Sequence, residues 1–283
     1  MATDAAPADM ATDAVLENVA LEVLAANLAS AERSRVPIGP VTASRSTLTV
    51  EEAYEIQLFN ITSRLAAGAS IVGRKVGLTS LAMQKQLGVD QPDYGVILDD
   101  MMVLAPATLD ASTLISPRVE AEFSFRLGRN IPAAHALAGP MTLEQLRACV
   151  DRVYLSMEII DSRITDWKIT LADTIADNAS SARLVIGESS VATAALFDSL
   201  PGVTLQLLCD DEVVSEGEGR AVLGDPLLGA LWAVNKLGEL GEDLAVGEII
   251  LAGAVHASVP LTRGSTWTVR AEGFPSVTIR TAL

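Results

Sequence analysis

Residues 117–125 read PRVEAEFSF, and this stretch is the part of the sequence that best indicates the fold. Its apolar and polar residues alternate, as in a β-strand whose successive side chains point to opposite faces of a sheet. The apolar face would consist of Val119, Ala121, Phe123 and Phe125. The polar face would consist of Glu120, Glu122 and Ser124. The stretch therefore predicts a strand with one apolar face and two carboxylates on the other.

Other short strands are expected on both sides of this one. They span residues 70–77, 94–98, 153–160, 182–186, 204–209, 212–216, 248–251, 266–270 and 276–280. Few helices are expected between them, and these span residues 80–88, 142–151 and 225–241. Many strands with few intervening helices predict an α+β fold, in which mixed or antiparallel β-sheet forms a roll or a sandwich.

The chain before residue 70 differs from the rest in composition and in its expected secondary structure, which is helical. Residues 1–12 are rich in Ala, Asp and Pro and are expected to form a disordered tail. An apolar stripe then predicts a helix, and it consists of Val15, Val19, Leu21, Val23, Leu24 and Leu28. A second helix is expected from Thr49, which has capping-box spacing to Glu52. We therefore expect an N-terminal helical layer over 13–69 and a catalytic β-roll domain over 70–283.

Composition limits the kinds of partner. The net charge of −16 repels phosphate backbones and anionic lipids, so neither nucleic acid nor a membrane is expected as a partner. The chain has no run of about 18 apolar residues, and its first residues lack the basic region of a signal peptide. These features predict a cytoplasmic protein. Cys149 and Cys209 are expected to be reduced, because a chain of this length needs no disulfide to stabilise its core.

A further carboxylate lies in the stretch MEIIDSR at residues 157–163. Glu158 ends an apolar run, where an unpaired charge would be costly. Together with Glu120 and Glu122 it would make an oxygen-rich site of the kind that Mg²⁺ or Mn²⁺ prefers. From spacing alone, an alternative stays open, in which the Glu120 and Glu122 side chains lie on the solvent-exposed face of a surface strand.

Two other polar stretches could contribute to a site. Lys75 lies between Gly73 and Gly77 in the stretch GRKVGLTS, and in a strand these glycines would leave space beside it. Such a lysine could stabilise negative charge on a substrate, or it could be a surface lysine with its ammonium in water. Residues 173–181, DTIADNASS, could offer hydroxyl, amide and backbone N–H groups to an anion, or form an ordinary turn.

Histidine-based chemistry is limited, because His135 and His256 are the only histidines. No G-x-S-x-G, H-E-x-x-H, phosphate-loop or dinucleotide-binding glycine motif occurs, so hydrolase triads and zinc peptidases are not expected. His135 is expected at the surface. His256 is expected to have a structural role rather than a catalytic one, since histidines are often partly buried for structural reasons.

Five separated motifs, taken together, resemble those of a known family. They are GRKVGLTS at 73–80, QPDYGVILDD at 91–100, PRVEAE at 117–122, MEIIDSR at 157–163 and DNASS at 177–181. The set is similar to the 2-keto-4-pentenoate hydratases of aromatic and steroid meta-cleavage pathways, which belong to the fumarylacetoacetate hydrolase superfamily. The resemblance runs from about residue 50 to the C-terminus.

This resemblance implies a mixed β-sheet roll with an N-terminal helical layer. It implies that Mg²⁺ or Mn²⁺ is held by three carboxylates, Glu120, Glu122 and Glu158. It implies a catalytic role for Lys75, and points to Asp93 and Ser180 as further pocket residues. It also implies a homo-oligomer, often built on pentamers, and an association with an aldolase or decarboxylase of the same pathway.

The implied reaction is the addition of water to 2-hydroxypenta-2,4-dienoate, which gives 4-hydroxy-2-oxopentanoate. A divalent ion could chelate the C1 carboxylate and the C2 oxygen of this small anionic substrate and act as a Lewis acid. Lys75 would help neutralise the substrate's charge, and Asp93 would move a proton.

Three alternative functions remain open. A sister decarboxylase that acts on 2-oxo-3-enedioates, of the 4-oxalocrotonate type, is similar in motifs and metal. A C–C bond hydrolase of the same superfamily commonly needs a Glu–His pair, and neither histidine here falls in a matching stretch. A non-catalytic subunit that supports a partner enzyme would not need to retain the three glutamates and Lys75.

Overall fold

The computed structural model describes the backbone of residues 8–80, 84 and 89–283, and the side chains from residue 18 onward within those ranges. The helices are α1 (Ala8–Ser34), α2 (Val41–Ser44), α3 (Val50–Ala66), α5 (Leu143–Arg147), α6 (Leu171–Ala176), α7 (Ala194–Ser199) and α8 (Pro226–Glu239). The strands are β1 (Ile71–Gly77), β2 (Asp93–Leu98), β3 (Met102–Leu104), β4 (Ala107–Leu109), β5 (Arg118–Leu127), β6 (Val150–Ile160), β7 (Ser181–Ile186), β8 (Ser190–Val191), β9 (Thr204–Cys209), β10 (Glu212–Glu218), β11 (Ile249–Ala254), β12 (Val259–Pro260), β13 (Thr266–Arg270) and β14 (Val277–Thr281).

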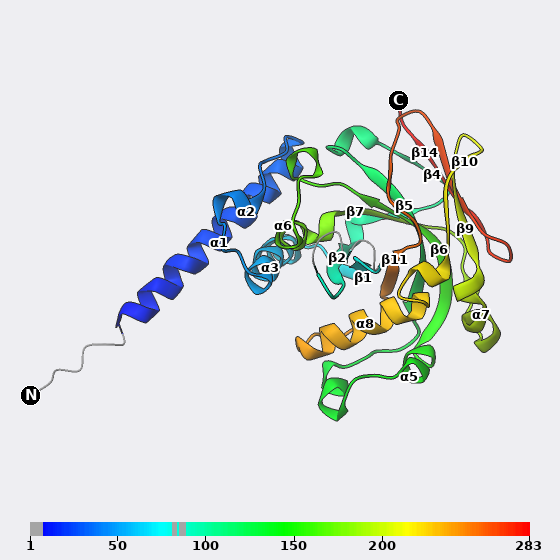
Figure 1. Cartoon of the computed structure of the whole chain (residues 1–283), viewed down its shortest axis with the longest axis horizontal. Coiled ribbons are helices and arrows are strands. Elements are labelled where there is room, and N and C mark those ends of the chain that lie inside the picture. The colour runs from blue at the N-terminus through cyan, green and yellow to red at the C-terminus, as the bar shows by residue number, and fades with distance from the viewer. Residues whose placement is uncertain (1–7, 81–83, 85–88) are drawn as a thin grey trace, which may run out of the picture.

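Within the described residues, the strands form two sheets (Figure 1). The larger sheet has the order β2-β1-β11-β5-β6-β7-β3, with β12 beside β5 and β8 beside β6. The smaller sheet has the order β10-β9-β13-β14-β4. Antiparallel pairs predominate, but β1 and β11, β3 and β7, and β4 and β14 run parallel. The α+β fold with mixed sheets is therefore confirmed.

The main core lies between the two sheets. The odd-numbered residues of β5 and β6 supply one side of it: Val119, Ala121, Phe123, Phe125, Val153, Leu155, Met157 and Ile159. The smaller sheet supplies the other: Leu205, Leu207, Trp267, Val269, Val277 and Ile279. Fully burying an apolar side chain contributes about 1.5–3 kcal/mol, so this core sets the orientation of both strands. The even-numbered residues of β5 and β6 must then point to the opposite face.

The helices before β1 pack with α6 in a cluster of their own (Figure 1). Helix α3 begins with the expected capping box, in which the Thr49 and Glu52 side chains each accept a hydrogen bond from the other's backbone N–H. The buried face of α1 differs from the expected stripe. It consists of Leu21, Ala25, Leu28 and Ala31. Val19 and Val23 are about half exposed, because they lie two positions away from this face on the helix.

The expected boundaries differ at several places. Helix α1 begins at Ala8, inside the range expected as a tail, and residues 1–7 lie outside the described residues, as does most of the helix expected at 80–88. The helix expected over 142–151 ends at Arg147, because β6 pairs with β5 from Val150 onward. None of the described helices is both long and apolar enough to cross a membrane.

Candidate active site

Strands β5 and β6 bring three glutamates together on the face that points away from the main core. The antiparallel register places Glu120 directly opposite Glu158, and Glu122 follows two residues later on the same face. One carboxylate oxygen from each of the three lies within 4.8 Å of the other two. Glu122 and Glu158 are each 1% exposed, and Glu120 is partly buried. The alternative of a solvent-exposed strand face is therefore wrong.

Each buried glutamate is held by a neighbouring segment. The backbone N–H of Gly253 donates to Glu122 Oε2 at 3.0 Å. The hydroxyl of Ser181 donates to Glu158 Oε1 at 3.3 Å. The second oxygen of Glu158, Oε2, makes no regular hydrogen bond among the described residues, and its polar neighbour is the Lys75 ammonium at 3.4 Å. A buried carboxylate oxygen without a hydrogen bond is costly, so a closer cation would stabilise it.

Lys75 reaches this group from β1. Its Nζ atom lies 3.4 Å from Glu158 Oε2 and donates a hydrogen bond of 3.0 Å to the carbonyl of Ala179. The side chain is 6% exposed, so Lys75 is not a surface lysine. The space beside it comes from Gly77 and from Gly95 of β2, since a Cβ at either would lie within 3.4 Å of the lysine side chain.

Gly73, the other glycine expected to flank the lysine, serves a different purpose. A Cβ at this position would lie 2.2 Å from the carbonyl oxygen of Ile249. The absence of a side chain therefore lets β1 approach its parallel neighbour β11, and Gly73 does not shape the space around the lysine.

Asp93 lies at the start of β2, opposite Gly77 of β1. The side chain is buried, and its Oδ1 atom has no hydrogen-bond partner among the described residues. Burial raises the pKa of Asp93, and the nearby Lys75 ammonium opposes this shift. The phenol oxygen of Tyr54, from α3, accepts a hydrogen bond from the backbone N–H of Tyr94. Burial is the main cause that raises the pKa of Tyr54, and the negative charge of Asp93 adds to it.

The electrostatics of the cluster are unbalanced. The pKa of Glu120 is raised to about 7, mainly by burial and next by repulsion from Glu158. The same two causes raise the pKa of Glu122 well above its ordinary value. Burial also raises the pKa of Glu158, although Lys75 opposes it. Burial would lower the pKa of Lys75, but Glu158 and Asp93 raise it, so the ammonium stays charged. Among the described residues, four carboxylates thus face the Lys75 ammonium, with Arg118 also acting on Glu120. A divalent cation would offset the remaining negative charge.

The polar stretch 173–181 is not a single loop. Helix α6 ends at Ala176, after a capping box between Thr170 and Asp173. A turn follows over 177–181. It presents the carbonyl oxygen of Ala179 to the Lys75 ammonium and the hydroxyl of Ser181 to the Glu158 carboxylate.

The two serines of this turn have different partners. The Ser180 hydroxyl donates to Asp177 Oδ2 at 3.2 Å. The next residue, Ser181, provides the hydroxyl that contacts Glu158. Only Ser180 is among the site residues expected from the sequence, and the position of Ser181 beside it in the DNASS motif is the signal that points to the second.

The histidines lie outside this charge cluster. His256 Nε2 accepts a hydrogen bond from the backbone N–H of Ala121, and its Nδ1 lies 2.9 Å from the carbonyl of Ala257. This pattern requires a neutral ring with its proton on Nδ1, and burial lowers the His256 pKa accordingly. His135 is partly exposed and packs against Gly238 of α8.

Comparison with known proteins places this geometry in context. No protein-family model matches the chain. It is 40% identical over 256 residues to the 2-keto-4-pentenoate hydratase of Paraburkholderia xenovorans strain LB400. The aligned region covers 90% of this chain and 93% of that relative. The chain belongs to the 2-keto-4-pentenoate hydratase family. A further relative is the 2-hydroxyhexa-2,4-dienoate hydratase of Comamonas testosteroni, 36% identical over 263 residues, with 92% of this chain and 97% of that one covered.

Solved structures extend the likeness beyond the hydratase family. The 4-oxalocrotonate decarboxylase of Pseudomonas putida G7, complexed with magnesium and adipate, superposes with a TM-score of 0.85 at 35% identity, over 92% of this chain and 97% of the other. The fumarylpyruvate hydrolase of Pseudomonas aeruginosa, complexed with Mn²⁺ and pyruvate, has a TM-score of 0.57 at 16% identity, over 74% of this chain and 88% of the other. The second likeness shows the shared fold alone.

Proposed function

We propose that the protein adds water to 2-hydroxypenta-2,4-dienoate and releases 4-hydroxy-2-oxopentanoate. Family membership supports the hydratase class. The observation that carries the proposal is the buried cluster in which Glu120, Glu122 and Glu158 converge beside Lys75. Such a site suits a small anion that is bound through a divalent cation and an ammonium group.

Glu120, Glu122 and Glu158 are the proposed ligands of Mg²⁺ or Mn²⁺. The donor set is all oxygen, which both ions prefer, and the polar contact of Glu158 Oε2 is an ion pair with Lys75 at 3.4 Å. When bound, the ion supplies Lewis-acid polarisation of a 2-oxo acid.

Lys75 and Asp93 are the proposed catalytic side chains. The Lys75 ammonium, held between the Ala179 carbonyl and Glu158, binds the anionic end of the substrate and stabilises negative charge that develops on its C2 oxygen. Hydration requires that the 2-hydroxyl loses a proton, that C5 gains one, and that water adds its oxygen at C4 and a proton at C3. The raised pKa of Asp93 and its unpartnered Oδ1 suit a group that carries one of these protons.

Ser180 has a different place in this proposal from the one expected. Its hydroxyl donates to Asp177, so we propose that it acts on the site through that carboxylate, whereas Ser181 contacts Glu158 directly.

We propose that the protein is cytoplasmic, that it forms a homo-oligomer, as the family resemblance implies, and that its substrate is a small 2-hydroxy-dienoate. The molar mass in solution, measured by analytical ultracentrifugation, tests the assembly: a value near the 29.7 kDa of one chain would contradict it.

The assay that tests the function follows two substrates in parallel. With 2-hydroxypenta-2,4-dienoate, the loss of ultraviolet absorbance should match the formation of 4-hydroxy-2-oxopentanoate. A 2-oxo-3-enedioate should release little CO₂. Rapid CO₂ release without hydration of the monocarboxylate would favour the decarboxylase, the second candidate given its structural likeness. Loss of neither substrate in the presence of Mg²⁺ or Mn²⁺ would contradict both.

A further inference from the structure

The turn 177–181 has a backbone conformation that its residues do not favour. Asn178, Ala179 and Ser180 have φ angles of 53°, 49° and 55°, in the left-handed region. Asparagine tolerates this region better than most residues, but alanine and serine do not. Three such residues in succession persist only where the surroundings impose the shape, and strain of this kind is often found at functional sites.

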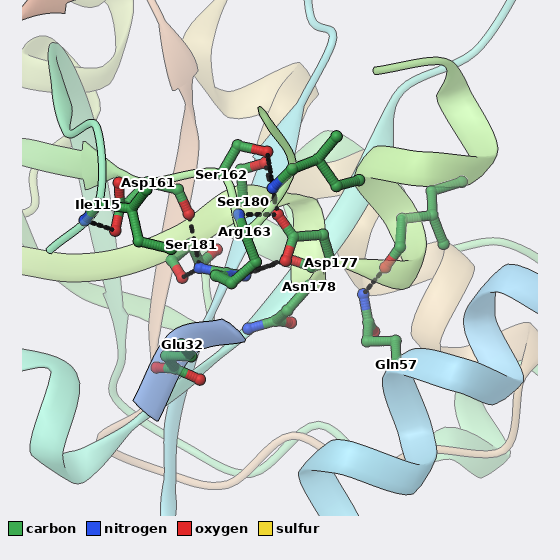
Figure 2. A network of polar contacts seen from close by, with 12 residues as sticks. Glu32, Gln57, Ile115, Asp161, Ser162, Arg163, Asp177, Asn178, Ser180 and Ser181 are labelled. Carbon is green, nitrogen blue, oxygen red and sulfur yellow. Dashed lines mark hydrogen bonds and ion pairs between the residues drawn. The ribbon is translucent and has the colours of Figure 1, made fainter. Parts of the chain in front are cut away.

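A buried ion pair imposes this shape. Asp177 and Arg163 lie against each other in the interior, and Asp177 also accepts hydrogen bonds from the Arg163 backbone at 3.1 Å and from the Ser180 hydroxyl at 3.2 Å. Figure 2 shows this carboxylate at the centre of the network. Its partners come from within the turn and from the segment after β6, so the Asp177 carboxylate links the turn to that segment.

The Arg163 guanidinium ties both ends of the turn to the end of β6. Its Nη1 donates to the carbonyl of Asp161 at 2.7 Å and to that of Ser181 at 3.0 Å, and its Nη2 donates to the carbonyl of Asp177 (Figure 2). Asp161 lies three residues after Glu158 in the chain. A planar guanidinium can make these contacts at once, whereas a lysine ammonium lacks the fork geometry that they require.

The shape of the turn decides two contacts of the proposed site. The carbonyl of Ala179 accepts from Lys75 Nζ at 3.0 Å, and the hydroxyl of Ser181 donates to Glu158 Oε1 at 3.3 Å. On the other side, the Asn178 amide bonds to both the N–H and the carbonyl of Val96, at 2.8 and 2.9 Å, which fixes the turn against β2.

We propose that Arg163 and Asp177 are positioning residues of the active site. They hold the backbone of the turn 177–181 in its left-handed conformation, and this conformation orients the Lys75 ammonium and the Glu158 carboxylate. This inference rests on the proposed function, because it assigns the ion pair a role in that same site. Neither residue belongs to the Glu120, Glu122 and Glu158 set or contacts it directly among the described hydrogen bonds and ion pairs.

The test is the Asp177→Asn variant, which keeps the side-chain shape and removes its charge. Mn²⁺ affinity is measured by electron paramagnetic resonance without substrate, and kcat and KM are measured separately. Altered support of metal-site residues typically costs 10- to 100-fold in affinity or activity, so we expect roughly that loss in both Mn²⁺ affinity and kcat. The matched control is Asp151→Asn, which breaks the Arg126–Asp151 pair at the far end of β5 and β6 and should leave both values unchanged.

A milder variant covers the case in which Asp177→Asn does not fold. Ser180→Ala removes one hydrogen bond to Asp177 without leaving a buried charge unpaired, and it should weaken Mn²⁺ binding and kcat a few-fold together. Unchanged Mn²⁺ affinity per folded molecule, in whichever of the two variants folds, overturns the inference even if kcat falls. A wild-type protein that binds Mn²⁺ but hydrates no dienoate would count against the proposed function instead, and the Mn²⁺ comparison would still decide the role of the ion pair.

Discussion

The Lys75 ammonium lies near the carboxylates of Glu120, Glu122, Glu158 and Asp93, and these neighbours determine what it can do. Replacing it with methionine keeps much of the volume and removes the charge. We expect Lys75→Met to lower kcat roughly 10²–10³-fold, the usual cost of removing a group that stabilises developing charge. Mn²⁺ should bind at least as tightly as in the wild-type protein, because the ammonium repels a cation beside Glu158. Tenfold weaker Mn²⁺ binding would show that the lysine instead holds the glutamates in place.

Glu122 illustrates the conflict between stability and the proposed metal site. Its pKa is raised, so the folded state binds a proton more readily than the unfolded chain does. The ionised side chain therefore destabilises the metal-free fold as the pH rises. We expect Glu122→Gln to stabilise metal-free protein at pH 8 by about 0.5–2 kcal/mol, the usual range for a single stabilising substitution. Thermal unfolding with chelator present measures this, and an equal gain at pH 5 would contradict the explanation.

Glu120 gives the metal affinity a defined pH dependence. Burial and Glu158 raise its pKa to about 7, and a protonated carboxyl group cannot act as a metal ligand. Mg²⁺ should therefore bind more weakly as the pH falls from 8 to 6, by up to about tenfold per unit for each proton released. Calorimetric titrations at pH 6, 7 and 8 measure the effect. The same affinity at pH 6 and 8 would mean that Glu120 does not lose a proton when the ion binds.

At the scale of elements, the spacing between β2 and the turn 177–181 depends on a glycine. A Cβ at Gly95 would lie 2.6 Å from the carbonyl of Asn178 and 2.9 Å from the Ser181 hydroxyl. Gly95→Ala should displace the turn and lower kcat at least roughly tenfold, since displacing a positioned group by about 1 Å can cost 10²-fold. Gly39→Ala is the matched control, because nothing lies within 4 Å of a Cβ there. Equal kcat values for the two variants would rule out this steric requirement.

Individual elements also show what the sequence could predict. The alternation in β5 correctly separated the core residues from the glutamates, because side chains in a strand have a period of two. The period did not reveal that both faces are buried, since this depends on the helices and strands that cover them. The turn 177–181 could not be predicted, because three successive left-handed residues contradict local preference and persist through contacts with the distant Arg163 and Val96.

For the whole molecule, the fold class followed from many strands with few helices, but the sheet order did not. Strand β1 lies beside β11, with Gly73 opposite Ile249, and no local pattern links segments so far apart in the chain. The same limit applies to the site. Sequence alone identified the three glutamates and Lys75 as candidates. The contacts that Ser181, Gly253 and the Ala179 carbonyl make with them became visible only in the structure.

The three-carboxylate site is tested by the turnover of 2-hydroxypenta-2,4-dienoate by chelator-treated protein as Mg²⁺ or Mn²⁺ is added back. We predict no turnover without metal, recovery that saturates at one ion per chain, and no recovery in Glu158→Gln. The ion should also raise the unfolding free energy by about 2.7 kcal/mol at 100 times its Kd. Full turnover in the complete absence of divalent metal would contradict the three-carboxylate site on which the proposed function rests.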